Sequence, residues 1–189
     1  MKAIILFITI FSFSYATSQQ NALKSIKNLY YKANADNYQS HTVKMNTMQA
    51  AIGLQTTDVV FYYDSWQIDP DESSYKLAYR VVKIEVSYNI AASANYKIEY
   101  LLNDDENLVF YFKKVEGAYE NLSLRYYLDK NKLIKAISKN IAENGKSEEY
   151  SDMKNFKQAD IDFAKQYIQK SKKYIAFFNE MIILESIDK

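Results

Sequence analysis

The pattern of apolar and polar residues predicts a helix, a run of strands and a second, longer helix along this chain. Between Gln19 and Asn37 the apolar residues recur at spacings of three and four, which is the period of an amphipathic helix. From about Asn155 the same period returns in two adjacent stripes, which together predict a wide apolar helix face lying across a sheet. The apolar positions of the first helix are Leu23, Ile26, Tyr30 and Ala33. Those of the second are Ile161, Ala164, Ile168, Ile175, Phe178 and Ile182 in one stripe, and Phe163, Tyr167, Tyr174, Phe177, Met181 and Leu184 in the other.

Strand signals dominate between the two helices. Alternating apolar residues after His41 predict a first strand, and Gly53 with the polar residues 55–58 predicts its interruption. Residues 59–66 are typical of a second strand, and residues 68–74, which include the only proline, of a loop. Residues 77–90 alternate over a length that predicts a bent or bulged strand, with Val82, Ile84, Val86 and Tyr88 on one face.

A hairpin pattern occurs twice, at residues 97–114 and 123–139. Each copy has an apolar residue, a tyrosine and an apolar residue at alternate positions, followed by a polar turn and a leucine. The copies are Ile98, Tyr100, Leu102 and Leu108, and Leu124, Tyr126, Leu128 and Leu133. The polar residues 142–152 are expected to be a linker. The sequence therefore predicts an α+β fold: an N-terminal helix, a curved antiparallel meander of about six or seven strands, and a long C-terminal helix packed on the sheet.

The first eighteen residues have the layout of a secretory signal peptide. Lys2 precedes an apolar stretch from Ala3 to Phe13, which is shorter than the roughly 20 residues of a membrane-spanning helix. Small residues favour cleavage after Ala16 or after Ser18. The sequence thus predicts a signal peptide at 1–18, a single domain at 19–189 without a transmembrane segment, and export to the periplasm or the extracellular space.

Composition excludes several classes of protein. The chain has no cysteine, so thiol catalysis and cysteine-ligated zinc are ruled out. Its three glycines are far apart, which rules out phosphate loops and dinucleotide-binding motifs. Lys and Arg number 24 and Asp and Glu 23, and this balance argues against nucleic acid as a partner. Residues 58–129 are acidic and residues 130–173 basic, which is interpreted as ordinary solvated surface.

No catalytic or metal site emerges from the residue spacing. The loop beginning at Asp69 fails the EF-hand pattern, because Ser74 and Arg80 stand where glycine and glutamate are required. The acidic turns at 69–72 and 104–106 are therefore interpreted as solvated turns, and no metal or other cofactor is expected. His41 is the sole histidine and has no nucleophile motif around it, so a structural role is favoured. A pair of carboxylates acting as a glycoside hydrolase remains open, without a means of choosing the pair.

The positive signal is aromatic content, with 18 Tyr, 10 Phe and 1 Trp. Tyrosine combines an apolar ring with a polar tip and suits the binding of sugars, peptides or lipid head groups, although β-sheets favour it for packing alone. Residues 62–66 place aromatic side chains next to the proline loop, and two adjacent tyrosines at 126–127 point to opposite faces of a strand. The candidate ligand-binding residues are Tyr62, Tyr63, Trp66, Tyr126 and Tyr127.

Three segments carry a family resemblance: IKNLYYKANA, MQAAIGLQTTDVVFYY and YYLDKNKLIKAI. They resemble small uncharacterised exported proteins of Bacteroidota-type bacteria, which implies an exported α+β domain without implying an activity. The leading hypothesis is a non-catalytic exported domain that binds a small ligand or an unknown protein through its sheet. The alternatives are a carrier of an apolar or lipid-like ligand, with the C-terminal helix as a lid, and a small carboxylate-dependent hydrolase.

Overall fold

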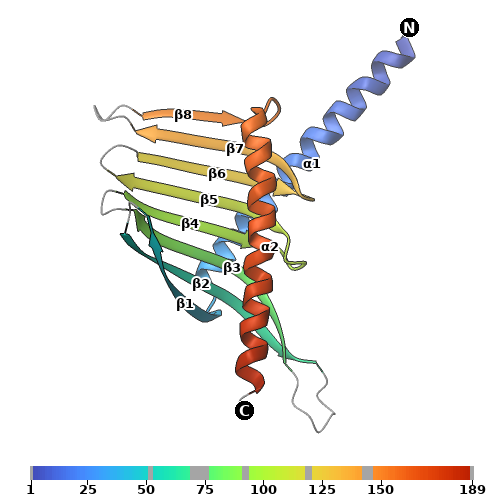
Figure 1. Cartoon of the computed structure of the whole chain (residues 1–189). Helices are drawn as coiled ribbons and strands as arrows, with labels where there is room; N and C mark the ends of the chain where they lie inside the picture. The colour runs from blue at the N-terminus through green and yellow to red at the C-terminus, as the bar shows by residue number, and fades with distance from the viewer. Residues whose placement is uncertain are drawn as a thin grey trace.

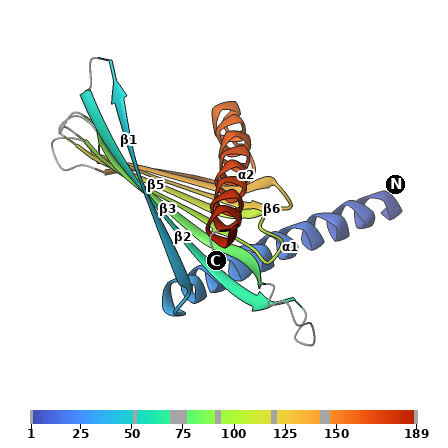
Figure 2. The same cartoon turned by 60° about the horizontal axis from the view of Figure 1, so that its bottom comes forward.

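The fold is an open, eight-stranded antiparallel sheet with one helix on each face (Figures 1 and 2). In a computed structural model the chain is described at residues 2–50, 53–68, 77–90, 94–117, 121–141 and 147–187, with side chains from Thr17 onward. The strands follow one another in chain order across the sheet. The elements are α1 (Lys2–Ala35), β1 (Gln39–Gln49), β2 (Gly53–Gln67), β3 (Leu77–Ile90), β4 (Ala94–Leu102), β5 (Leu108–Gly117), β6 (Asn121–Asp129), β7 (Lys132–Ile141), β8 (Ser147–Asp152) and α2 (Gln158–Ile187).

Two hydrophobic clusters hold the helices on opposite faces of the sheet. The larger cluster joins α2 to β1–β7, with Phe178 and Ile175 of the helix buried against the strands. The smaller cluster joins α1 to the other face through Ile26 and Ala33, which are both buried. The predicted helix periodicities are therefore confirmed, because the buried positions fall on the predicted stripes. We call the two surfaces of the sheet the α2 face and the α1 face.

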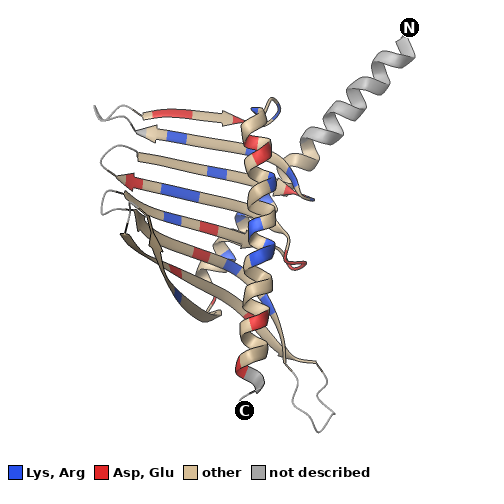
Figure 3. Cartoon of the chain, in the orientation of Figure 1, with Lys and Arg blue, Asp and Glu red and all other residues tan. Residues whose placement is uncertain are grey.

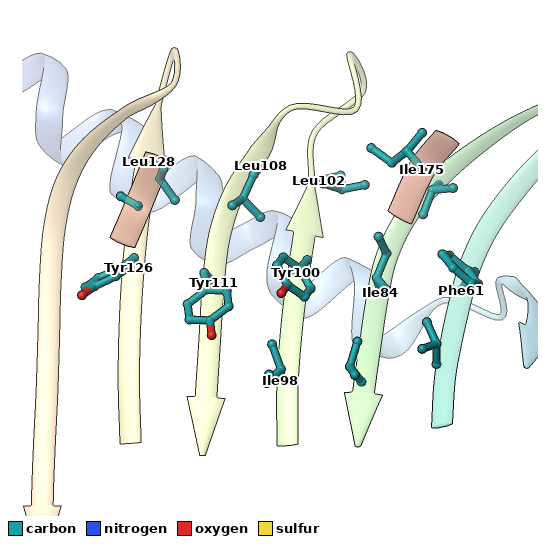
Figure 4. Packing of buried hydrophobic residues seen from close by; sticks show 14 of the residues in the cluster. Phe61, Ile84, Ile98, Tyr100, Leu102, Leu108, Tyr111, Tyr126, Leu128 and Ile175 are labelled. Atoms are coloured by element: carbon teal, nitrogen blue, oxygen red, sulfur yellow. The ribbon is translucent and has the colours of Figure 1, made fainter. Parts of the chain in front are cut away.

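The repeated hairpin places its tyrosines in one line across the sheet. Tyr100 on β4 pairs with Tyr111 on β5, which pairs with Tyr126 on β6. Continuing the same register, Tyr100 pairs with Ile84 and Ile84 with Phe61, so five strands contribute to a single row on the α2 face (Figure 4). This row of Phe61, Ile84, Tyr100, Tyr111 and Tyr126 is fully buried. The predicted antiparallel meander is thus confirmed.

Tight turns follow the predicted chemistry. Only Lys130 and Asn131 separate β6 from β7, and both have positive φ, as a two-residue hairpin turn requires. Between β4 and β5 the side chain of Asn103 accepts hydrogen bonds from the backbone N–H groups of Asp105 and Asn107 at 3.1 and 2.8 Å. Asparagine therefore closes this loop through its own carboxamide.

Three details of the strand prediction were wrong. The polar residues at 147–152, expected to be linker, form β8, so the sheet has eight strands instead of six or seven. Residues 53–58, expected to be a break between the first and second strands, belong to β2, where they pair with β1. Val82 lies on the α1 face, opposite to Ile84, because a bulge beside Tyr62 and Tyr63 shifts the alternation of β3.

The predicted start of the mature chain lies against the sheet. The side chain of Gln19 donates hydrogen bonds to the carbonyl oxygens of Ile134 at 2.6 Å and Met153 at 3.1 Å. The predicted loop at 68–74 falls almost wholly outside the described residues. No helix within the described part of the chain is long and apolar enough to cross a membrane.

Candidate ligand-binding site

A cavity of about 280 Å³ opens between α1 and strands β5 and β6. The helix supplies one wall because its residues recur every third or fourth position, and the strands supply the other because alternate residues share a face. Ring side chains dominate the lining. The residues are Ile26, Lys27, Tyr30 and Tyr31 from α1, Phe110 and Phe112 from β5, and Arg125 and Tyr127 from β6. We call this cavity the α1 pocket.

The aromatic rings of the α1 pocket pack against one another, in one edge-to-face pair and one tilted pair. The centroid of Phe110 lies 5.4 Å from that of Tyr30 and 5.0 Å from that of Tyr127, with interplanar angles of 70° and 56°. Burial raises the pKa of both Tyr30 and Tyr127 above the usual tyrosine value, and nearby carboxylates add to the effect at Tyr30. Both hydroxyls are therefore neutral at physiological pH.

The charged residues of the lining are two cations. The guanidinium of Arg125 lies 5.6 Å from the ring centroid of Phe112, a cation–π arrangement that holds it along the wall of the α1 pocket. Lys27 is exposed at the mouth. Neither cation has a carboxylate partner among the described residues. The α1 pocket thus combines flat apolar walls with uncompensated positive charge.

A buried charge network fixes the helix wall. The hydroxyl of Tyr30 donates to Glu99 Oε2 at 3.4 Å, and Glu99 Oε1 lies 2.9 Å from Lys97 Nζ. One turn further along α1, the carbonyl oxygen of the Asn34 side chain accepts a hydrogen bond of 2.9 Å from Lys83 Nζ. These contacts set the rotation of α1, so that Tyr30 faces the α1 pocket on one side and the network on the other.

Lys83 is the central member of that network. Only 4 % of the residue is exposed, and its Nζ lies 2.9 Å from Glu85 Oε1 and 4.3 Å from the ring centroid of Tyr62. Glu85 and Glu99 are directly opposite each other on β3 and β4, where like charges would repel. The ion pairs of Lys83 with Glu85 and of Lys97 with Glu99 therefore offset the repulsion between the two carboxylates.

The five predicted site residues do not gather at one place. Tyr127 lines the α1 pocket. Tyr62 belongs to the charge network, where its hydroxyl donates to Glu85 at 3.4 Å. Tyr63 packs against Phe178 of α2, with centroids 5.0 Å apart, and Trp66 near the end of β2 is half exposed.

Tyr126 lies on the α2 face, as the predicted opposition to Tyr127 requires. Its hydroxyl donates a hydrogen bond of 2.7 Å to Asp160 at the start of α2. Tyr126 is 1 % exposed, so its ring is a packing element of the sheet core. His41 lies 3.7 Å from Glu185 near the end of α2, and the two side chains join β1 to that helix.

Most of the α1 pocket was not predicted from the sequence. Tyr30 and Ile26 were assigned to an amphipathic helix, but nothing local indicated that Phe110, Phe112 and Arg125 would face it. A usable signal was present in β6, where Arg125 and Tyr127 alternate with apolar residues and must share the face away from Tyr126. The partner wall comes from a helix about a hundred residues earlier, and only the tertiary structure brings it there.

No protein-family model matches the chain, and neither the curated proteins nor the solved structures include a significant match. The predicted acidic turn at 69–72 lies outside the described residues. Within the described part of the chain, no group of three or more acidic or histidine side chains is placed to hold a metal ion.

Proposed function

We propose that this protein is a non-catalytic, exported binding domain whose α1 pocket takes a small organic anion with a flat apolar body. An aromatic carboxylate represents the class. The observation that carries the proposal is the lining itself, in which five aromatic rings surround one cavity whose charged side chains are Lys27 and Arg125.

The rings favour a flat ligand. Aromatic side chains bind planar apolar groups by offset stacking and edge-to-face contact, at centroid separations like those already present between Phe110 and its neighbours. The volume of about 280 Å³ is close to the lower limit for small-molecule pockets, so a compact ligand of one or two rings fits it better than a polymer.

The cations favour an acidic group on that ligand. Arginine binds a carboxylate through two parallel N–H donors, and such charge-assisted bonds are about twice as strong as neutral ones. Because the Arg125 guanidinium rests on the Phe112 ring, it is oriented before the ligand arrives. The lining contains no histidine and no carboxylate, so it offers recognition groups and no obvious general base.

The test is the binding of 2-naphthoate to the mature protein, measured by isothermal titration calorimetry. An Arg125→Gln variant is expected to bind 2-naphthoate about tenfold more weakly, since it loses a bidentate charged contact. The neutral analogue 2-naphthalenemethanol should bind the wild type and Arg125→Gln within about twofold of each other, because its contacts are with the rings alone.

Lys27 and Lys24 provide a matched pair of control positions on α1. Lys24→Gln should leave naphthoate binding unchanged because Lys24 does not line the α1 pocket, whereas Lys27→Gln should weaken it. If both substitutions weakened naphthoate binding equally, Lys27 would act only by long-range electrostatic attraction and not by contact with the ligand. Absence of naphthoate binding to the wild type, or undiminished binding to Arg125→Gln, would overturn the proposal.

A further inference from the structure

A line of aliphatic side chains crosses the α2 face beside the tyrosine row. Val43 on β1 pairs with Val59 on β2, Val59 with Val86 on β3, and Val86 with Ile98 on β4. These four residues lie on successive strands, so their side chains form one continuous row across the sheet. We call Val43, Val59, Val86 and Ile98 the aliphatic row.

The aliphatic row ends at a lysine. The next residue in register after Ile98 is Lys113 on β5, and beyond Lys113 comes Leu124 on β6. Ile98 and Leu124 both belong to the hydrophobic cluster under α2, which places Lys113 on the same face between two apolar neighbours. Along β5 it is flanked on that face by Tyr111 and Val115.

Lys113 is the one Lys, Arg, Asp or Glu on the α2 face of the described parts of β1–β7. Its Nζ lies 5.5 Å from the ring centroid of Tyr96, and it has no carboxylate partner among the residues that the structure describes. By strand register the nearest acidic positions on this face are on β8, three strands away, at the acidic edge visible in Figure 3. From the helix, Asp160 reaches this face at Tyr126 on β6, where it accepts the hydrogen bond of that hydroxyl. Lys113 is partly exposed, and no described residue forms an ion pair with it, so its ammonium group is available to an anionic ligand.

Aromatic side chains on one side of α2 pack over the centre of the α2 face. Tyr167 stacks on Tyr111 with centroids 3.7 Å apart, and Tyr174 lies 5.7 Å from Tyr100. The same side continues into Phe163 and Phe177, which are 44 % and 40 % exposed. The rings of Tyr167 and Tyr174 contact the tyrosine row beside the aliphatic row, and Val59, Val86 and Ile98 are themselves buried. A ligand chain therefore reaches the aliphatic row only when α2 moves away from the sheet, a displacement that breaks no strand pairing.

A polar atom beneath this cover lacks a partner. The hydroxyl of Tyr100 is fully buried and makes no hydrogen bond within the described structure. Tyr100 and Tyr111 form the row next to Ile98 (Figure 4), and Ile98 pairs with Lys113, so the unpaired hydroxyl lies in the row beside the lysine. Buried hydroxyls without partners are rare, and a ligand oxygen would satisfy this one.

From these contacts we propose a second binding site, separate from the α1 pocket: the α2 face binds an alkyl-chain carboxylate. The carboxylate pairs with Lys113, and the chain lies along the aliphatic row beneath α2. From β5 to β1 the row spans four strand spacings, about 19 Å, which accommodates an extended chain of a common fatty acid. Lys113 favours a ligand with a carboxylate, and the aliphatic row favours an alkyl chain over a ring.

The experiment titrates the mature protein with dodecanoate and, separately, with 1-dodecanol, using native mass spectrometry to count bound molecules and calorimetry for affinity. Lys113→Met should weaken dodecanoate binding about tenfold or more and leave dodecanol binding within about twofold. The matched control is Lys114→Met on the opposite face, where the lysine is paired with Glu116 at 2.6 Å; it should bind dodecanoate as the wild type does.

Lys113→Gln repeats the test if the methionine variant does not fold, as judged by circular dichroism. Arg125→Gln separates the two sites, and it should keep full dodecanoate binding. Three results would overturn the proposal: no dodecanoate bound to the wild type, equal affinity in the Lys113 and Lys114 variants, or loss of dodecanoate binding in Arg125→Gln, which would assign the fatty acid to the α1 pocket.

Discussion

The ring of Tyr167 on α2 stacks on the ring of Tyr111 on β5, with centroids 3.7 Å apart and planes 11° from parallel. Tyr111 is fully buried in the tyrosine row, and Tyr167 is half buried at the edge of the helix. The centroid distance of this stack is shorter than those of the pairs that Tyr174 and Phe178 of α2 make with the sheet, and the stack lies beside the proposed site.

Removing the Tyr167 ring should loosen α2. Tyr167→Ala is expected to lower the free energy of unfolding by about 2 to 4 kcal/mol, because the stacked contact is lost and a void remains over Tyr111. Phe163→Ala, one turn away, should cost less than about 1 kcal/mol since that ring is already 44 % exposed. Urea unfolding followed by circular dichroism measures both, and equal losses would show that the Tyr167 stack contributes nothing beyond exposed apolar surface.

Two tyrosines of the row should respond in opposite ways to loss of the hydroxyl. Tyr126→Phe is expected to destabilise the fold by about 1 to 2 kcal/mol, because it removes the hydrogen bond to Asp160. Tyr100→Phe should be neutral or stabilising, since the Tyr100 hydroxyl has no partner within the described structure. Urea midpoints of the two variants at pH 7 decide the matter. A destabilised Tyr100→Phe would mean that the hydroxyl bonds to water.

The tyrosine row should make the fold sensitive to alkali. Burial raises the pKa values of Tyr100, Tyr111 and Tyr126 above the ordinary value of 10.0, so the fold holds their protons more tightly than the unfolded chain does. This contribution to stability is complete below pH 10 and is lost as pH rises above it. Each tyrosine adds up to about 1.4 kcal/mol per pH unit to the loss.

Urea midpoints measured from pH 8 to pH 11.5 should therefore be flat up to about pH 9.5 and then fall. Tyr100→Phe should reduce the slope above pH 10 because one titrating group is gone. Absorbance at 295 nm of the folded protein should show these three tyrosines failing to ionise before the chain unfolds. Titration of every tyrosine in a chain that is still folded would contradict the assignment.

Lys83 should be required for docking of α1. Lys83→Met is expected to lower the unfolding free energy by at least about 2 kcal/mol, because Glu85 then loses its buried partner and the Asn34 contact to α1 is lost. The exposed pair of Lys114 and Glu116 supplies the control, and Lys114→Met should change stability by less than about 0.5 kcal/mol. Chemical denaturation of the two variants side by side tests the difference. Similar free energies of unfolding for the two variants would show that the Lys83 network contributes no more to stability than the exposed pair does.

The mature N-terminus is expected to begin at Gln19 or Thr17 if the chain is exported. Cleavage after Ser18 would retain the Gln19 side chain that bonds to Ile134 and Met153. Intact mass measurement of the protein recovered from its own host checks the site. An unprocessed chain beginning at Met1 would overturn the export proposal.

Local patterns were sufficient for most of the fold. The period of about 3.6 residues marked both helices, and the residues it assigned to their apolar faces, such as Ile26 and Phe178, are buried. The repeated hairpin defined β4 to β7 because alternation in a strand fixes which residues share a face. The Lys130–Asn131 turn was likewise readable, since its residue types suit positive φ.

Local patterns failed where the deciding contact was distant. β8 has a polar, acidic sequence and becomes a strand because β7 offers it an unpaired edge. Val82 changed face because of a bulge set by the pairing of β3 with β2, which no pattern within β3 reveals.

Residue period and turn chemistry, both readable along the chain, specify the kinds of element, their order and the tyrosine-rich strands. Three relationships are visible only in the folded chain: α1 and α2 occupy opposite faces, Arg125 and Phe112 line one pocket with Tyr30, and Lys113 lies at the end of the aliphatic row. Those relationships join residues from separate elements, and their physical basis is the burial of apolar surface across long chain separations, which acts on the assembled sheet and not on any one segment.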